Sequence, residues 1–340
     1  MSHSKAYCAT FFILITHTMH TINDLIAKIN LGVENISYHT EPENLYAPIR
    51  YILSIGGKRI RPLLMLMGYN LYQENVDAIL NNALALETYH NFTLLHDDLM
   101  DKSDMRRGNP TVHKKWNENT AILSGDTMLI MAYQLFNQGI KNAEAWTAFI
   151  EATLGVCEGQ QYDIDFETRN DVSEEEYMEM IRLKTSLLLG YALKIGAILG
   201  GADTEDQENL YAFGEKMGLA FQLQDDWLDV YGDPKKFQKK LGGDIVDNKK
   251  TFMLIHAYEL ADDAQKAELD KWISAKNFQE AEKIEAVTHI YNIVGIGPLV
   301  QKKIEDMFTQ ALSCLDKVKV DNQKKAELRH FADKLLGRQY

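Results

Sequence analysis

The sequence predicts an all-α protein, and three observations support this class. In NNALALETYHNFTLLHDDLM, residues 81–100, apolar residues recur three and four positions apart, as they do on one face of a helix. MEMIRLKTSLLLGYALKIGAIL, residues 178–199, is apolar on almost every side, which is typical of a helix enclosed by other helices. Strand patterns are nearly absent. The sequence therefore favours a helical bundle, in which sites are built from inward-pointing side chains.

Helix boundaries follow from capping residues. Ser173 precedes a run of glutamates, as an N-cap precedes an acidic first turn, and the Gly200 and Gly201 pair ends that helix. The stretch LYAFGEKMGLAFQLQDDWLDVYGDP, residues 210–234, predicts another long helix that ends near Pro234. The two longest predicted helices thus follow one another in the chain.

The domain organisation is read from the absence of linkers. No proline and no Gly/Ser-rich joint lies between Thr111 and Asp233, so we expect one domain over residues 19–340. The apolar run YCATFFILI near the N-terminus is too short to span a bilayer and precedes no cleavage site. Met19 is a plausible start, so we expect residues 1–18 to be an extension and no transmembrane segment.

Charge and cysteine content exclude some function classes. A net charge of -13 argues against nucleic acid as the partner, because that binding needs a basic surface. The three cysteines show no CxxC spacing, which fits a reducing cytoplasm better than a disulfide framework or a zinc site. Any anion site in this chain must therefore be local.

Two aspartate clusters share the same internal spacing. The first aspartate cluster comprises Asp97, Asp98 and Asp101, and the second comprises Asp225, Asp226 and Asp229. On a helix the first and last members of each cluster lie one turn apart on one side, where like charges repel. Clusters of oxygen ligands without His or Cys suit Mg²⁺, which binds few carboxylates together with substrate phosphates. Two facing clusters could hold a diphosphate between them.

Two basic motifs predict a second anion pocket that needs no metal. In GGKRIRP, Lys58, Arg59 and Arg61 follow two glycines, and Arg106 and Arg107 follow the first aspartate cluster in RRG. Arginines make forked contacts with phosphate, and glycines let the backbone approach closely.

Five motifs together resemble one known family. GGKRIRP, DDLMDKSDMRRGNPTVH, KTS, FQLQDDWLD and KKLGGDIVDNKK occur in this order between Gly56 and Lys250, and the set resembles the trans-polyprenyl diphosphate synthases, the short-chain members in particular. The resemblance implies an isoprenoid-synthase-type bundle around a deep central cavity. It also implies a homodimer that condenses isopentenyl diphosphate with an allylic diphosphate, using about three Mg²⁺ ions per active site.

The resemblance also implies roles for individual residues. The main Mg²⁺ ligands would be Asp97, Asp101 and Asp225, supported by Asp98, Asp226 and Asp229. The allylic diphosphate would contact Arg106, Lys184, Lys240 and Lys249. The isopentenyl diphosphate would contact Lys58, Arg61, His90 and Arg107, and the carbocation would lie near Thr185 and Gln222. Metal ions and cationic side chains would stabilise the charge that develops on the leaving diphosphate.

The helix ahead of the first aspartate cluster is expected to limit product length. Phe92 lies five residues before Asp97, roughly 7.5 Å along a helix, so its ring could meet the growing tail. Phe92 followed by Thr93 resembles the pattern of enzymes that form the C20 product geranylgeranyl diphosphate. Farnesyl diphosphate (C15) and longer products remain alternatives, because Tyr89 could alter the floor and a helical Phe is usually core.

Other functions remain open at this point. A terpene cyclase or head-to-head synthase of the same fold would not need the isopentenyl diphosphate pocket, and a non-catalytic partner subunit would be expected to have lost acidic ligands. An all-α metal phosphohydrolase could use His96 and Asp97, but would leave the second aspartate cluster and GGKRIRP unexplained.

Overall fold

The computed structural model describes residues 19–233 and 241–337. Helices account for almost all of the regular structure in this part of the chain, which confirms the all-α prediction. The expected extension over residues 1–18 lies outside the described residues, and the single domain over residues 19–340 stays a prediction.

In the described part of the chain, eight helical segments come before α8 (Glu174–Ile181). They are α1 (Ile22–Glu34), α2 (Glu43–Ser54), α3 (Ile60–Asn70), the short η1 (Val76–Ile79), α4 (Leu80–Met100), α5 (Val112–Lys115), α6 (Glu118–Gln138) and α7 (Ala143–Glu167). Between α4 and α5, strands β1 (Met105–Arg106) and β2 (Asn109–Pro110) form a small antiparallel pair.

The remaining segments complete the bundle and its lower end. They are α8 (Glu174–Ile181), the π-helical η2 (Arg182–Ser186), α9 (Leu187–Gly200), α10 (Thr204–Tyr231), α12 (Gly243–Val246), α13 (Phe252–Leu260), α14 (Asp263–Ser274), α15 (Glu280–Val294), α16 (Ile296–Lys317) and α17 (Asn322–Leu336).

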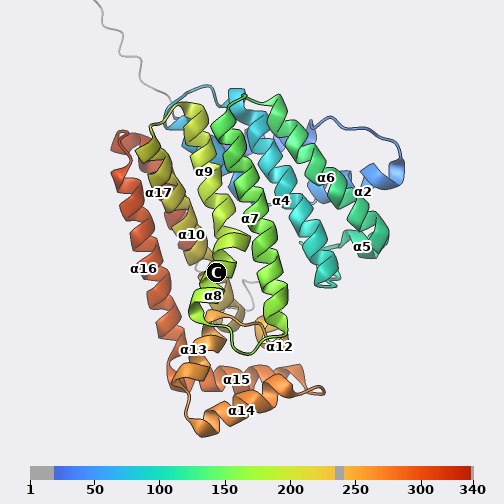
Figure 1. Cartoon of the computed structure of the whole chain (residues 1–340), viewed down its shortest axis with the longest axis vertical. Helices are drawn as coiled ribbons and strands as arrows, with labels where there is room; N and C mark the ends of the chain where they lie inside the picture. The colour runs from blue at the N-terminus through green and yellow to red at the C-terminus, as the bar shows by residue number, and fades with distance from the viewer. Residues whose placement is uncertain (1–18, 234–240, 338–340) are drawn as a thin grey trace, which may run out of the picture.

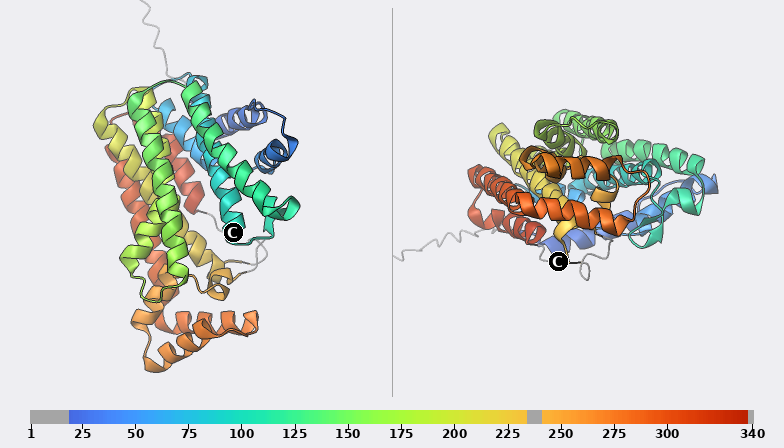
Figure 2. Two further views of the ribbon diagram at one scale, coloured as in Figure 1. Left: turned by 45° about the vertical axis from the view of Figure 1, so that its right-hand side comes forward. Right: turned by 90° about the horizontal axis from the view of Figure 1, so that it is seen from below.

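The long helices run roughly along one direction and pack side by side (Figure 1). Helix α10 packs against α9 and α16, α3 packs against α9, and α4 packs against α6. Helices α14 and α15 lie across the lower end of the bundle, as the view from below shows (Figure 2). The C-terminal ends of α4, α7 and α10 point toward this lower end (Figure 1).

The predicted helix boundaries are close to those of the structure. Residues 81–100 form α4, and Ser173 caps α8 with a capping box in which its Oγ accepts from the Glu176 N–H. The stretch 178–199 is helical as predicted but is interrupted by η2. Helix α10 begins at Thr204, earlier than the predicted residue 210.

One helical stretch in the described residues is long and apolar enough to cross a membrane. This stretch is Glu174–Gly200, and 72% of its apolar window is buried inside the protein. That burial agrees with the prediction of a helix enclosed by other helices.

Candidate active site

The first aspartate cluster lies at the C-terminal end of α4. Asp97 is largely enclosed, and this burial raises its pKa to about 6, with Lys184 acting in the opposite direction and Asp101 reinforcing the increase. Asp98 is buried and both of its oxygens accept from Arg106, with Nε and Nη2 each at 2.7 Å. Asp97 and Asp101 are therefore the members poised for an external cation, while Asp98 fixes Arg106.

The second aspartate cluster lies near the C-terminal end of α10. Burial, reinforced by the carboxylate of Asp244, raises the pKa of Asp226 above its ordinary value, while hydrogen bonds from Tyr177 and Gln222 act in the opposite direction. Burial and Asp244 also raise the pKa of Asp229, whose Oδ2 accepts from the Asp244 N–H at 3.0 Å. The first turn of α12 thus adds a further carboxylate to this cluster.

Lys249 shows that the two clusters face a common space. The Lys249 side chain is 54% exposed, and its Nζ lies 3.4 Å from Asp244 Oδ1. Partial desolvation lowers its pKa, but the carboxylates of Asp244, Asp163, Asp101 and Asp226 outweigh this and hold the pKa above its ordinary range. These carboxylates come from α12, α7, the end of α4 and α10. One ammonium group therefore interacts with acidic residues that lie far apart in the sequence.

Lys184 and Thr185 lie in the π-helical segment η2, an irregularity that is frequent at functional sites. The Lys184 Nζ pairs with Asp163 Oδ2 at 2.5 Å, and Thr185 Oγ1 donates to Gln222 Oε1 at 3.2 Å. This approach of η2 to α10 needs a glycine one turn before Gln222, because a Cβ on Gly218 would lie 2.6 Å from the Ser186 Cα. The structure thus places Thr185 against Gln222, while Lys184 of the same segment meets Asp163, and their expected roles stay predictions.

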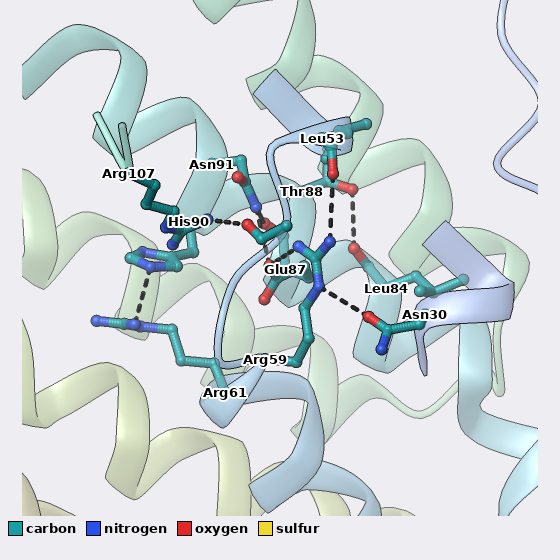
Figure 3. A network of polar contacts seen from close by, with 11 residues as sticks. Asn30, Leu53, Arg59, Arg61, Leu84, Glu87, Thr88, His90, Asn91 and Arg107 are labelled. Atoms are coloured by element: carbon teal, nitrogen blue, oxygen red, sulfur yellow. Dashed lines mark hydrogen bonds and ion pairs between the residues drawn. The ribbon is translucent and has the colours of Figure 1, made fainter. Parts of the chain in front are cut away.

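The GGKRIRP motif places its two arginines in different environments (Figure 3). Arg59 is 5% exposed and its Nη1 pairs with Glu87 Oε1 at 2.5 Å, while its Nε donates to Asn30 Oδ1 at 3.2 Å. Glu87 is 2% exposed and also accepts from Asn91 Nδ2 at 3.0 Å. Arg59 therefore anchors the motif in the protein interior, and Lys58 beside it is exposed.

Arg61 and His90 form a pair at the edge of this network. Arg61 Nη1 lies 3.0 Å from His90 Nε2, and because a guanidinium only donates, Nε2 is the acceptor. Burial, with the charges of Arg61, Arg107 and Arg106, lowers the pKa of His90 well below its ordinary value. His90 is consequently neutral and supports a cluster of arginines without adding charge.

Arg107 lies against the glycines of the same motif. Its Nη1 donates to the Gly56 carbonyl, and Figure 3 shows its side chain beside His90. A Cβ on Gly57, whose φ is +155°, would lie 2.7 Å from Arg107 Nη1. Glycine at this position therefore lets the backbone accommodate the guanidinium. Residues of α3, α4 and the β1–β2 turn thus lie together, and the second anion pocket stays a prediction.

The residues expected to limit product length all lie on α4, but they differ in burial and in contacts. The Phe92 ring is 8% exposed and lies 5.4 Å from the Tyr89 ring and 4.8 Å from the His96 ring, centroid to centroid. The Tyr89 hydroxyl donates to the Thr153 carbonyl at 2.7 Å. Thr93 is half-buried and its Oγ1 donates to the His90 carbonyl at 2.9 Å.

The donor set fits a divalent cation shared with substrate. Within residues 19–233 and 241–337, no group of three or more His, Cys, Asp or Glu side chains could enclose a metal ion. Mg²⁺ commonly takes only one or two carboxylates and completes its shell with water and phosphate oxygens. The carboxylates of Asp97 and Asp101 would suit such a partial set, and a bound cation would stabilise the charged form of Asp97, whose pKa burial raises.

Sequence reasoning missed several residues that the site contains. Asp163, Glu87 and Tyr177 are single polar residues on helices and carry no spacing signal, whereas Asp244 lies inside a motif that had already been singled out. Lys240 lies outside the described residues. Lys58 is described and exposed, and its expected contact with substrate stays a prediction.

Comparisons with known proteins agree with this arrangement. The model of the polyprenyl synthetase family matches residues 42–291. A geranylgeranyl diphosphate synthase of Methanosarcina mazei is 35% identical over 323 residues, which cover 94% of this chain and 97% of that protein. A geranylfarnesyl diphosphate synthase of Natronomonas pharaonis is 35% identical, with 88% of this chain and 92% of that protein covered. A crystal structure of a geranylgeranyl pyrophosphate synthase has a TM-score of 0.90 and 44% identity, covering 95% of this chain and 100% of that one.

An all-α bundle with two facing sets of carboxylates and a cluster of arginines is typical of enzymes that bind diphosphates through divalent metals. The chain belongs to the polyprenyl synthetase family. It is therefore a metal-dependent prenyltransferase, an isoprenyl diphosphate synthase, and the resemblance stated from its motifs is confirmed. The phosphohydrolase alternative required His96 as a metal ligand. In the structure, His96 Nε2 instead lies 3.2 Å from the Ile122 carbonyl on α6, so this alternative has no support.

Proposed function

We propose that this enzyme condenses isopentenyl diphosphate head to tail (1'-4) with allylic diphosphates and that its main product is geranylgeranyl diphosphate. The observation that carries the proposal is the set of carboxylates from α4, α7, α10 and α12 around Lys249, with the arginine cluster of Figure 3 nearby. Relatives named for geranylgeranyl diphosphate support the C20 product, and the geranylfarnesyl relative makes C25 the next candidate.

In this proposal, the allylic diphosphate and the isopentenyl diphosphate bind at two separate sites. Asp97, Asp101 and Asp225 would hold about three Mg²⁺ ions together with the allylic diphosphate, and bound Mg²⁺ would neutralise the charge of the leaving group. Lys184 and Lys249 would add cationic contacts from η2 and the segment after α12.

The isopentenyl diphosphate would bind on the other side of the reacting carbons. Lys58, Arg61 and Arg107 would contact its oxygens, with neutral His90 accepting from Arg61 and so fixing the guanidinium. The Thr185 hydroxyl and the Gln222 carbonyl would face the carbocation and stabilise it by their dipoles. Arg106, fixed by Asp98, would contact the allylic diphosphate with its remaining donors.

Product analysis tests this proposal directly. The purified protein, Mg²⁺ and isopentenyl diphosphate would be incubated with each of the C5, C10 and C15 allylic primers, and products measured by mass spectrometry. We expect a C20 product, and no product when a chelator replaces Mg²⁺. Failure to elongate any primer by folded protein would favour a cyclase, a head-to-head synthase or a partner subunit. A C15 or C25 main product would overturn only the assigned length.

Phe92→Ala should shift the product distribution toward longer chains, because it removes a buried ring from the helix that ends in the first aspartate cluster. Product lengths by mass spectrometry check this expectation. Phe331→Ala is a matched control, since Phe331 is also 8% exposed but lies on α17. If both variants give the wild-type distribution, the tail does not end at Phe92.

We expect a homodimer that forms through α6 and α7. Leu123 and Ile130 on α6 are 59% and 61% exposed, and Leu154 on α7 is 58% exposed, so these helices carry large apolar side chains that nothing in the described chain covers. Association of two copies would bury them. The expected location of the enzyme is the cytoplasm, and Cys157 and Cys314 are free.

Leu123→Glu combined with Leu154→Glu should convert the dimer to a monomer, because two charges would be buried in the interface. Sedimentation equilibrium would measure the mass. Leu31→Glu is the control, since Leu31 on α1 is 60% exposed and lies outside this surface. A monomeric wild-type protein, or a double variant that stays dimeric, would contradict this interface.

A further inference from the structure

A chain of hydrogen bonds runs from α8 through α10 to η2. The Tyr177 side chain is 1% exposed and its hydroxyl donates to Asp226 Oδ2. The other oxygen, Oδ1, accepts from Gln222 Nε2 at 2.9 Å. The opposite end of the same amide, Gln222 Oε1, accepts from Thr185 Oγ1 at 3.2 Å. Tyr177 is thus connected to Thr185 through two side chains of α10.

The turn of α8 that precedes Tyr177 is held by a capping box and an ion pair. Its helix α8 starts at the Ser173 capping box, in which Glu176 accepts from the Ser173 N–H at 3.0 Å. Arg169 pairs with the same Glu176 at 2.8 Å, so the turn before Tyr177 is held in place. The backbone of Tyr177 is therefore fixed in the position from which its hydroxyl reaches Asp226.

The orientation of the Gln222 amide has a chemical consequence. The two ends of an amide are nearly equal in size, so packing alone does not choose between them. Both oxygens of Asp226 accept hydrogen bonds, Oδ2 from the Tyr177 hydroxyl and Oδ1 from the Gln222 NH₂, and this geometry turns the Gln222 carbonyl toward Thr185. A flipped amide would present its positive end to the site where positive charge develops. The Tyr177 hydroxyl occupies Oδ2 of Asp226, which holds the carboxylate in place with Oδ1 facing the Gln222 NH₂ and so maintains this orientation.

We propose that Tyr177 is a positioning residue of the condensation, which acts through Asp226 to hold the Gln222 carbonyl toward Thr185 and the reacting carbons. The inference rests on the proposed function, because it assigns the Gln222 carbonyl to the developing cation. Tyr177 itself touches neither substrate nor metal in this scheme. Its contribution is preorganisation of a dipole that would otherwise have to reorient during the reaction.

Tyr177→Phe removes one hydroxyl and keeps the ring, so it tests this role with little change in packing. We expect kcat to fall by about ten- to a hundredfold, the range typical of lost outer hydrogen bonds, with KM for both diphosphates changed less than about twofold. Tyr72→Phe is the matched control, because the Tyr72 hydroxyl donates to Asp206 Oδ2 at 2.8 Å near the other end of α10. The control should retain wild-type kcat.

A double-mutant cycle separates positioning from a general loss of stability. If Tyr177 acts through Gln222, Tyr177→Phe should cost less than about threefold in kcat when Gln222 has already been replaced by Leu. Side-chain amide NMR with ¹⁵N-labelled glutamine gives a second measurement, in which Tyr177→Phe should shift the Gln222 NH₂ signals and Tyr72→Phe should not.

Three results would overturn the proposal. The first is a folded Tyr177→Phe enzyme whose kcat is within twofold of wild type. The second is a double variant in which the kcat losses of Tyr177→Phe and Gln222→Leu simply multiply. The third is a Tyr177→Phe protein whose Gln222 NH₂ signals do not shift. Wild-type activity is measured alongside, so a protein that makes no prenyl diphosphate would refute the proposed function instead. If Tyr177→Phe fails to fold, Asp226→Asn replaces it in the NMR measurement, and unchanged Gln222 signals there would also overturn the proposal.

Discussion

Replacement of Asp97 or Asp225 by alanine should reduce condensation by at least about a thousandfold, a loss comparable to removing a principal group that stabilises developing charge. Each replacement removes a carboxylate from one of the two facing clusters, and neither cluster has a spare residue in the same place. Asp98 is committed to Arg106, and Asp226 accepts from Tyr177 and Gln222. Steady-state assays with saturating Mg²⁺ and both diphosphates measure the loss.

The control for these variants is Asp104→Ala. Asp104 lies in the same segment as the first aspartate cluster but is exposed and pairs with Lys114 at 2.8 Å. Such a surface pair contributes little, so this variant should retain most of the activity. If Asp97→Ala or Asp225→Ala turned over at a rate near that of Asp104→Ala, the assignment of the metal ligands would be wrong.

Glu87→Gln should lower the free energy of unfolding by about 3 kcal/mol, because it leaves the Arg59 guanidinium buried without a counter-charge. The change keeps the shape of the side chain and its contact with Asn91. It should also raise KM for isopentenyl diphosphate, because Glu87 holds Arg59 in place and Arg59 lies between Lys58 and Arg61, which would contact that substrate. Urea unfolding at one protein concentration, followed by circular dichroism, measures the first effect.

Glu43→Gln is the matched control for this prediction. Glu43 pairs with Arg50 at 2.6 Å, but the pair lies at the surface, where its loss should cost much less than the loss of the buried pair. Arg59→Met in the Glu87→Gln background should recover much of the lost stability, because it removes the unpaired charge, but should not restore KM. Equal stability of Glu87→Gln and Glu43→Gln would contradict the role of the buried pair.

Much of the fold could be predicted because its signals are local. Residues 81–100 predicted α4 almost to the residue, and Ser173 predicted the start of α8, since periodicity and capping depend on neighbours in the chain. The π-helical η2 was not predicted, because RLKTS has ordinary helical composition and the irregularity arises where η2 packs against α7 and α10. The expected start of α10 was late for a related reason: its N-cap Asp203 precedes a polar first turn without apolar periodicity.

The sequence by itself determined the all-α class, the two aspartate clusters and the basic motifs, because spacing along a helix fixes which residues share a side. Only the tertiary structure decided how they are used. Arg59 and Arg61 are equivalent in GGKRIRP, but Glu87 draws one into the interior and His90 meets the other. Asp163 and Tyr177 join the site from elements that the sequence does not mark, since bringing them together depends on how helices pack over long separations in the chain.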